Sequence, residues 1–163
     1  MNFNKITEAD IESLIEISDS DRVTLKEDIS EDYSHDELAE LRVYPELIVE
    51  PENTEEVAQI MKFASKRNIP VTPRGSGTGL CGGAVAMEGG ILLLTTSMDE
   101  IIEIDEENLT ASVQPGVILM NFAEKVNDLG FMYPPDPGEK SATLGGNVLT
   151  NAGGMRAVKY GVT

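Results

Sequence analysis

The sequence predicts an α+β fold with two lobes, a small α/β lobe followed by a mainly antiparallel α+β lobe. Three observations lead to this class. Residues 45–96 show the succession strand, helix, strand, glycine-rich loop and strand, which is typical of an α/β layer. The last of these strands, GILLLTT (90–96), contains an unbroken apolar run, as expected of a strand buried on both faces. Residues 101–115 alternate apolar and polar side chains around a short turn, which predicts a β-hairpin.

The first 43 residues form a lead-in to the first lobe. Apolar residues recur at helical spacing over 9–18 and favour a short amphipathic helix. Residues 19–42 are acidic and irregular, and we expect them to cross the surface. The predicted domains are the lead-in 1–43, a first lobe 44–98 and a partial second lobe 99–163.

The elements of the first lobe each have a local signal. PELIVE (45–50) is a short apolar strand, and IPVTP (69–73) is the next one. Between them, Asn53 stands three residues before Glu56, which is typical of a helix start with a capping box. We expect this helix to end near Asn68.

The second lobe begins with the hairpin and continues with a helix. The strands 101–105 and 109–115 alternate their faces. Residues 117–129 have helical apolar spacing, and Gly130 provides a C-terminal stop.

Composition excludes several classes of function. A net charge of −17 over 163 residues argues against nucleic acid or an anionic membrane surface as a partner. No apolar run is long enough for a transmembrane helix, and the first residues lack the apolar core of a signal peptide. A single cysteine, Cys81, excludes an internal disulfide framework and leads us to expect a cytoplasmic protein.

The acidic residues are unevenly distributed. Residues 1–56 carry eighteen of the twenty-nine, whereas 57–87 and 140–163 carry none. Both glycine clusters of the chain, PRGSGTGLCGGA and LGGNVLTNAGG, lie inside these acid-free windows. Glycine leaves the main chain uncovered, and the absence of acidic side chains removes electrostatic repulsion. Together these features indicate an anionic ligand that approaches the main chain.

The first glycine cluster admits several interpretations. Gly77, Gly79 and Gly82 match G-x-G-x-x-G after a strand, but the seven residues before the next strand leave no room for the Rossmann helix. A P-loop is excluded because no Gly-Lys-Ser/Thr follows. A loop whose amides surround phosphate oxygens remains, with Ser76 and Thr78 as added donors and with charge from Arg74. A tight turn that needs glycine only for its geometry is the alternative.

The second cluster follows a proline-rich entry, PPDPG. Glycine pairs there leave room for a flat or extended ligand, and asparagine amides both donate and accept, as recognition of a ring edge requires. No nucleophile has a base beside it. The pattern therefore favours a site that holds a cofactor with its own chemistry.

Together, PRGSGTGL and PPDPGEKSATLGGNVLTNAGGMRAVKYG resemble the FAD-linked oxidases of the vanillyl-alcohol-oxidase type, from about Tyr44 onward. Within that superfamily the chain is most similar to the flavin subunit of glycolate oxidase and to D-lactate and D-2-hydroxyglutarate dehydrogenases. The resemblance implies a PCMH-type FAD-binding domain, of which this chain is an incomplete, N-terminal part. It also implies that FAD is the cofactor.

The resemblance assigns the cofactor-binding residues. The FAD pyrophosphate is expected at the main chain of Arg74, Gly75, Ser76, Gly77, Thr78, Gly79 and Leu80. The lining of the cofactor is expected from Pro135, Asp136, Ser141, Thr143, Gly145 and Gly146, with Asn147, Asn151, Gly153 and Gly154 near the flavin ring and Gly161 also approaching FAD. Some relatives attach FAD through a histidine where this chain has Thr78, so noncovalent FAD is expected here. Cys81 is expected to be a packed small residue.

The resemblance also implies the activity of the parent protein. A 2-hydroxy acid of the glycolate or D-lactate type loses its α-hydrogen as hydride to flavin N5, and a quinone, another flavoprotein or oxygen reoxidises the flavin. The substrate histidines, metal ligands and catalytic base of the family lie beyond the matched part. No catalytic or metal-binding residue is therefore assigned, and the chain alone is expected to be inactive. His35 is expected in an acidic surface loop.

Two alternatives stay open. One keeps the fold with a different substrate, such as another alcohol or an aldonolactone. The other is a non-catalytic module that retains the loop geometry without flavin.

Overall fold

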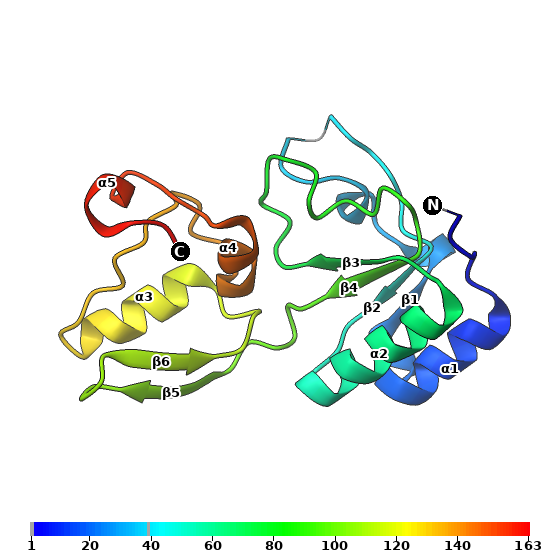
Figure 1. The fold of residues 1–163 in the computed structure, drawn as a ribbon, viewed down its shortest axis with the longest axis horizontal. Helices are drawn as coiled ribbons and strands as arrows, with labels where there is room; N and C mark the ends of the chain where they lie inside the picture. Colours follow the sequence, from blue (N-terminus) through cyan, green and yellow to red (C-terminus); the bar gives the residue numbers. More distant parts are fainter. Residues whose placement is uncertain (1, 39) are drawn as a thin grey trace. The chain divides into compact units, whose positions relative to one another are not determined.

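The computed structural model describes residues 2–38 and 40–163, and the chain folds into two compact units (Figure 1). Unit 1 is Met1–Ser97 and unit 2 is Met98–Thr163, so residues 1–43 belong to unit 1. Within the described residues, no helix has the length and apolar character needed to cross a membrane.

Unit 1 is built on a four-stranded sheet with the strand order β1-β2-β4-β3. Three strands run parallel, and β1 is antiparallel to β2. The strands are β1 (Val23–Leu25), β2 (Leu47–Val49), β3 (Val71–Arg74) and β4 (Ile91–Leu94). The expectation that residues 19–42 are irregular is therefore wrong at β1. A three-residue strand is too short to show a period-2 pattern, and it forms here because β2 offers it an edge.

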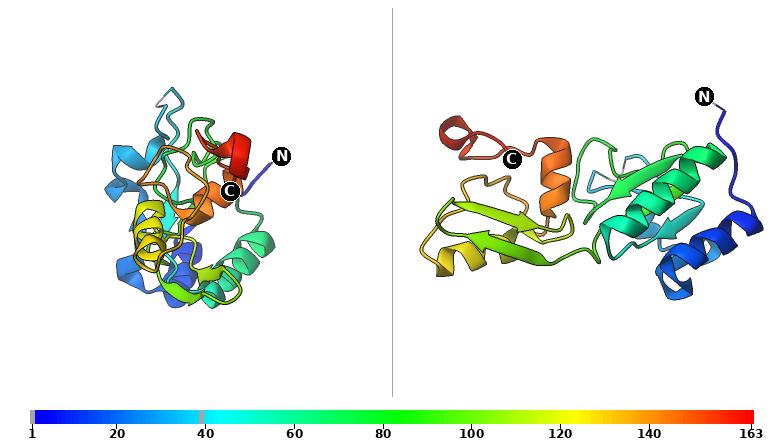
Figure 2. Two further views of the ribbon diagram at one scale, coloured as in Figure 1. Left: turned by 90° about the vertical axis from the view of Figure 1, so that its left-hand side faces the viewer. Right: turned by 60° about the horizontal axis from the view of Figure 1, so that its bottom comes forward.

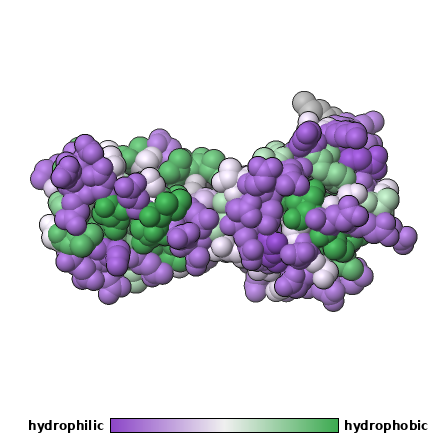
Figure 3. Space-filling view, turned by 90° about the horizontal axis from the view of Figure 1, so that it is seen from below, coloured by the Kyte–Doolittle hydropathy of each residue, from purple (hydrophilic) through white to green (hydrophobic). Residues whose placement is uncertain are grey.

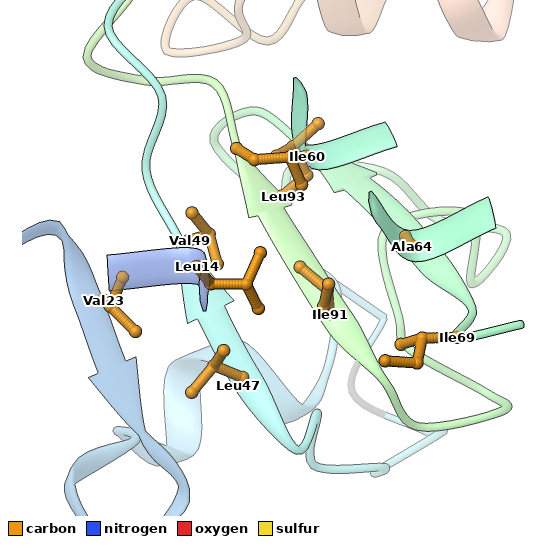
Figure 4. Packing of buried hydrophobic residues seen from close by; sticks show 9 residues of the cluster. All are labelled: Leu14, Val23, Leu47, Val49, Ile60, Ala64, Ile69, Ile91 and Leu93. Atoms are coloured by element: carbon orange, nitrogen blue, oxygen red, sulfur yellow. The ribbon is translucent and has the colours of Figure 1, made fainter. Parts of the chain in front are cut away.

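Two helices cover one face of this sheet, α1 (Glu8–Ser18) and α2 (Thr54–Arg67) (Figures 1 and 2). Alternate residues of the two central strands pack against them, as expected for side chains that point to opposite faces of a strand. Figure 4 shows this buried cluster, which consists of Leu14, Val23, Leu47, Val49, Ile60, Ala64, Ile69, Ile91 and Leu93.

Residues 20–34 of the lead-in cover the opposite face. On this face, Ile29 and Tyr33 pack against the alternate side chains of β2 and β4, which are Ile48, Leu92 and Leu94. This segment contains three short 3-10 helices, η1 (Ser20–Arg22), η2 (Lys26–Asp28) and η3 (Glu31–Ser34). It is therefore part of the fold of unit 1 and closes a second hydrophobic layer.

The ends of α2 confirm the predicted helix boundaries. The side chain of Asn53 accepts a hydrogen bond from the amide of Glu56 at 2.9 Å. Asn68 adopts the left-handed conformation and ends the helix.

Unit 2 contains the predicted hairpin and helix. β5 (Ile101–Asp105) pairs antiparallel with β6 (Thr110–Val113), with an irregularity near the start of β5. α3 (Leu119–Asp128) packs Phe122 and Val126 onto this two-stranded sheet. Phe122 also meets Tyr133 edge to face, with ring centroids 5.2 Å apart.

Unit 2 has two further helices, α4 (Leu144–Thr150), which contains the Gly145–Gly146 pair of the second glycine cluster, and α5 (Ala157–Tyr160). α4 begins at Thr143, whose hydroxyl accepts a hydrogen bond from the amide of Gly146 at 3.2 Å. Burial of Leu144 in the core of unit 2 fixes the helix on its support. The cap and this tertiary contact override the low helix propensity of the Gly145–Gly146 pair.

Candidate functional site

The first glycine cluster lies where a parallel sheet offers a ligand site. Gly75 follows directly on β3, at the carboxyl ends of the parallel strands β3 and β4. In open α/β sheets, ligands bind outside this end of the strands. A cavity of about 220 Å³ opens there, lined by Asp32, Tyr33, Arg74, Gly75, Ser76, Leu94 and Thr96.

Two glycines of the loop differ in what they permit. Gly77 has φ +76°, and a Cβ there would overlap Nη2 of Arg74, so the fold itself requires glycine. Gly79 lacks both constraints. Its φ lies outside the left-handed region, and among the described residues other than its chain neighbours no heavy atom lies within 4 Å of its ideal Cβ position. The fold leaves open space beside Gly79 that a ligand can occupy.

The main-chain amides of this loop are available for binding. Within residues 2–38 and 40–163, the amides of Gly77, Thr78 and Gly79 donate no hydrogen bond to the chain. Unpaired amides in a glycine loop bind anions such as phosphate oxygens. Ser76 and Thr78 lie half-buried beside them, whereas Leu80 is exposed.

Arg74 turns its side chain into the protein. It is buried, and its guanidinium donates to the carbonyl oxygens of Asp32 (2.9 Å), His35 (2.8 Å) and Ala84 (3.2 Å). It also lies over the ring of Tyr33, 5.6 Å from the centroid. Burial lowers the pKa of Arg74 below its ordinary value. The sequence led us to expect that Arg74 supplies positive charge to the ligand, but its guanidinium binds carbonyl oxygens of the chain itself.

The acid-free window around the loop is not acid-free in space. The buried carboxylate of Asp36 accepts hydrogen bonds from the amides of Gly82 (2.6 Å) and Leu38 (3.2 Å). The amide of Glu37 donates to the carbonyl of Gly79 at 3.1 Å. Sequence reasoning missed these loop contacts because Asp36 and Glu37 lie in an acidic segment forty residues earlier, without a local pattern.

One expectation about a neighbouring side chain is also revised. Cys81 is exposed, so the prediction that it is a packed small residue is wrong. It follows the glycine run in a loop that leaves its side chain in solvent. His35 is half-buried, and its Nδ1 lies 2.7 Å from the carbonyl oxygen of Asp36. It therefore belongs to the segment that contacts the loop.

In unit 2, the proline-rich entry is fixed by local contacts. Asp136 forms an ion pair with Arg156 at 3.5 Å, and the hydroxyl and amide of Ser141 both donate to the carboxylate of Glu139. Pro135 is half-buried. These contacts fix the conformation of the proline-rich segment within unit 2.

The glycines of the second cluster serve close approaches of the backbone. A Cβ at Gly145 would lie 2.6 Å from Cβ of Pro115, and one at Gly154 would overlap the carbonyl oxygen of Asp136. Thr143 is buried and caps α4, with Gly146 as its hydrogen-bond donor. The chain's own packing thus accounts for the small residues at 145 and 154.

Asn147 carries a buried polar group that the described part of the chain leaves without a partner. The residue is 4% exposed, and its Nδ2 has no hydrogen-bond partner within the described part of the chain. A buried unpaired donor is costly, and a bound acceptor would remove that cost. The remaining predicted residues, Asn151, Gly153 and Gly161, lie exposed on the segment that follows α4.

Each unit, taken by itself, offers groups whose chemistry suits FAD. Within residues 2–38 and 40–163, the loop of unit 1 has main-chain amides without a hydrogen-bond acceptor, which suit a pyrophosphate, and unit 2 has the buried amide donor of Asn147, which suits a polar ring edge.

Unit 2 also has an apolar groove. It has a volume of about 480 Å³ and lies between the hairpin and α3, with Ile104, Val113, Phe122, Phe131 and Leu144 among its walls. Figure 3 shows unit 2 in the left half of the picture, with hydrophobic residues at its surface. The walls of the groove also include the carboxylate residues Asp105 and Glu106.

Known structures share this fold. The chain matches alkyldihydroxyacetonephosphate synthase over 99% of its own length and 33% of that chain, with a TM-score of 0.83 and 20% identity. It matches p-cresol methylhydroxylase over 87% of its length and 29% of that chain, with a TM-score of 0.76 and 21% identity. These likenesses confirm the predicted PCMH-type α+β fold.

Sequence relatives are closer. The chain is 49% identical over 162 residues to a D-lactate dehydrogenase of Anaerostipes hadrus, which is 99% of this chain and 34% of that protein. It is 48% identical over 132 residues to the glycolate oxidase subunit GlcD of Bacillus subtilis, 80% of this chain and 28% of that protein. The chain thus spans 34% and 28% of the length of these two relatives. The model of a family described as "FAD binding domain" matches residues 45–163. Because this match covers well over half of the sequence, the chain belongs to the FAD binding domain family, and the predicted cofactor, FAD, is confirmed at the level of the family.

Proposed function

We propose that this chain is the FAD-binding part of a flavin-dependent 2-hydroxy-acid dehydrogenase of the glycolate or D-lactate type, with FAD held noncovalently. The observation that carries the proposal is the run of amides at Gly77, Thr78 and Gly79 that donate no hydrogen bond within residues 2–38 and 40–163, beside open space at the carboxyl ends of β3 and β4. The names of the two relatives, a D-lactate dehydrogenase and a glycolate oxidase subunit, support the substrate class.

Each part of the site has a proposed task. The three amides bind the pyrophosphate, with the hydroxyls of Ser76 and Thr78 as further donors. Asn147 donates from Nδ2 to an acceptor on the flavin ring. The residues that line the cofactor are Pro135, Asp136, Ser141, Thr143, Gly145 and Gly146, with Asn151, Gly153 and Gly154 near the ring and Gly161 also approaching FAD. Bound FAD supplies the hydride acceptor for the α-hydrogen of the substrate. The chain's own share is to hold and orient FAD.

The remaining parts of the activity belong to the whole protein. Because the relatives are about three times as long, we place the substrate-binding groups and the catalytic base in sequence beyond these 163 residues. The electron acceptor is proposed to be a flavoprotein or a quinone. We propose a cytoplasmic location, because the single exposed cysteine forms no disulfide and suits a reducing compartment.

The cofactor is tested by titrating the purified chain with FAD and following the visible absorbance and fluorescence of the flavin. We expect saturable binding, and release of all flavin into the supernatant after acid precipitation, because attachment is noncovalent. Absence of binding by a folded chain contradicts the proposal. Flavin that stays with the precipitate contradicts noncovalent attachment.

The loop is tested by Gly79→Ala. The fold has room for this methyl group, so thermal stability should stay unchanged while the ligand loses its space and FAD affinity falls by about tenfold or more. Gly83→Ala is the matched control, since no atom lies within 4 Å of its ideal Cβ position either and it follows the amide run. Equal FAD affinity in Gly79→Ala and Gly83→Ala would exclude the loop as the binding site.

The substrate class is tested on FAD-loaded protein under anaerobic conditions. We expect glycolate or D-lactate to bleach the flavin in a protein of the relatives' length and to leave it oxidised in this chain alone. Bleaching by an aldonolactone but by no 2-hydroxy acid would overturn the substrate class and leave the cofactor proposal standing.

A further inference from the structure

The segment of residues 31–37, here called the strap, contacts the glycine loop of unit 1 from two sides. The guanidinium of Arg74 is hydrogen-bonded to two strap carbonyls, those of Asp32 and His35, and to Ala84 after the loop. The carboxylate of Asp36 accepts the amide of Gly82, and the amide of Glu37 donates to Gly79. The strap lies outside residues 45–163, the part that matches the FAD binding domain family.

These contacts define the shape of the loop at both of its ends. The buried guanidinium lies where a side chain at Gly77 would be, so the loop folds closely around it. Asp36 is 3% exposed and holds the far end of the loop at Gly82. A charge-assisted hydrogen bond to a buried carboxylate is stronger than a neutral one. Between these two anchors lie the three unpaired amides.

We infer that Arg74 and Asp36 are positioning residues, which with the strap hold residues 75–82 in the conformation that binds the cofactor. This inference rests on the proposed FAD site and adds a part that precedes the family domain in the sequence. Prearranged amides spare the ligand the free energy of ordering the loop, which raises affinity. Neither side chain is required to touch FAD.

A role in geometry and a role in charge predict opposite results. If Arg74 acted by its charge on the pyrophosphate, Arg74→Lys would preserve binding. A lysine has a single nitrogen and cannot replace a planar fork that reaches three carbonyls, so the positioning role predicts weaker binding. If Asp36 acted by its charge, Asp36→Ala would strengthen binding of an anionic ligand. The positioning role predicts that it weakens binding.

The experiment combines hydrogen–deuterium exchange of the flavin-free chain with FAD titration of the wild type, Arg74→Lys and Asp36→Ala. We expect faster exchange confined to loop peptides 75–85 in both variants, and FAD dissociation constants raised by about tenfold or more. Asp10→Ala is the matched control. Asp10 is also 3% exposed and paired in unit 1, but with Arg67, so its loss should lower thermal stability without changing loop exchange or FAD affinity.

Each outcome decides the inference. Unchanged loop exchange in both variants overturns it, as does unchanged or tighter FAD binding with a loosened loop. Should Arg74→Lys fail to fold, Asp36→Ala carries the same test. A wild-type chain that binds no FAD contradicts the proposed function instead. The exchange measurement then still decides whether the strap holds the loop.

Discussion

Glycines that look equivalent in the printed sequence differ once their surroundings are known. Gly77 needs its positive φ and its missing side chain because the Arg74 guanidinium lies against it. Gly145 allows α4 to approach Pro115. Gly79 meets no such demand, and an alanine there is compatible with the fold. Only the last of these points to a ligand, so a glycine count overstates the size of the binding site.

Gly77→Ala separates structure from binding at the same loop. A non-glycine residue in the left-handed region costs about 1 to 2 kcal/mol, and here its Cβ would also displace the Arg74 guanidinium. We expect a lower melting temperature together with loss of FAD affinity, in contrast to Gly79→Ala, which should lose affinity alone. Thermal unfolding and FAD titration of both variants measure this. An unchanged melting temperature for Gly77→Ala would contradict the packing described for Arg74.

The helices α1 and α2 are joined by a pair of charged side chains. Asp10, near the start of α1, accepts from Nε of Arg67 at 2.6 Å and from its Nη2 at 3.1 Å. The hydrogen bond from Arg67 lowers the pKa of Asp10 from its ordinary value of 3.8 to about 2. Asp10 also closes the capping box with Thr7, so one carboxylate serves both the helix end and the contact between helices.

This pair predicts how stability depends on pH. Because the pKa of Asp10 is lower in the folded state, its contribution is complete above 3.8 and is lost as the pH falls toward 2. Asp10→Asn should therefore reduce the free energy of unfolding by about 1 to 2 kcal/mol near neutral pH, since Arg67 is partly in solvent. The difference from the wild type should vanish toward pH 2. Urea unfolding of both proteins at several pH values tests this, and a constant difference would contradict it.

The two units differ in how complete their cores are. Unit 1 buries both faces of the two central strands of its sheet, one under α1 and α2 and the other under residues 20–34. Unit 2 has a two-stranded sheet and an open apolar groove of about 480 Å³. Two-stranded sheets are marginally stable in water without further packing.

We therefore expect unit 2 to open before unit 1 when the chain is denatured. In mildly denaturing urea, amides of β5 and β6 should exchange with solvent faster than those of β2 and β4. Hydrogen exchange of the intact chain, followed by mass spectrometry, measures both units in one experiment. A single cooperative loss of protection in all four strands would contradict this expectation.

Much of the fold follows from local signals that the sequence displays. The Asn53 cap, the stop at Asn68 and the apolar run of β4 depend on residues within a few positions of one another, and all three were predicted. The hairpin β5–β6 follows from alternation and a short turn. The position of the first glycine loop after a strand was likewise visible in the order of elements.

What the sequence could not show depends on contacts between distant segments. Arg74 meets His35 across 39 positions, and Gly82 meets Asp36 across 46. No spacing rule joins such residues, and the acidic composition of the lead-in hides the one carboxylate that is buried. The sequence alone was sufficient for the class of fold, the family resemblance and the loop that offers its amides. Only the tertiary structure showed that part of the lead-in is folded onto that loop. Arg74 becomes buried and bonded to main-chain carbonyls, and Asp36 becomes buried and bonded to main-chain amides, when the chain brings both segments to the same end of one sheet.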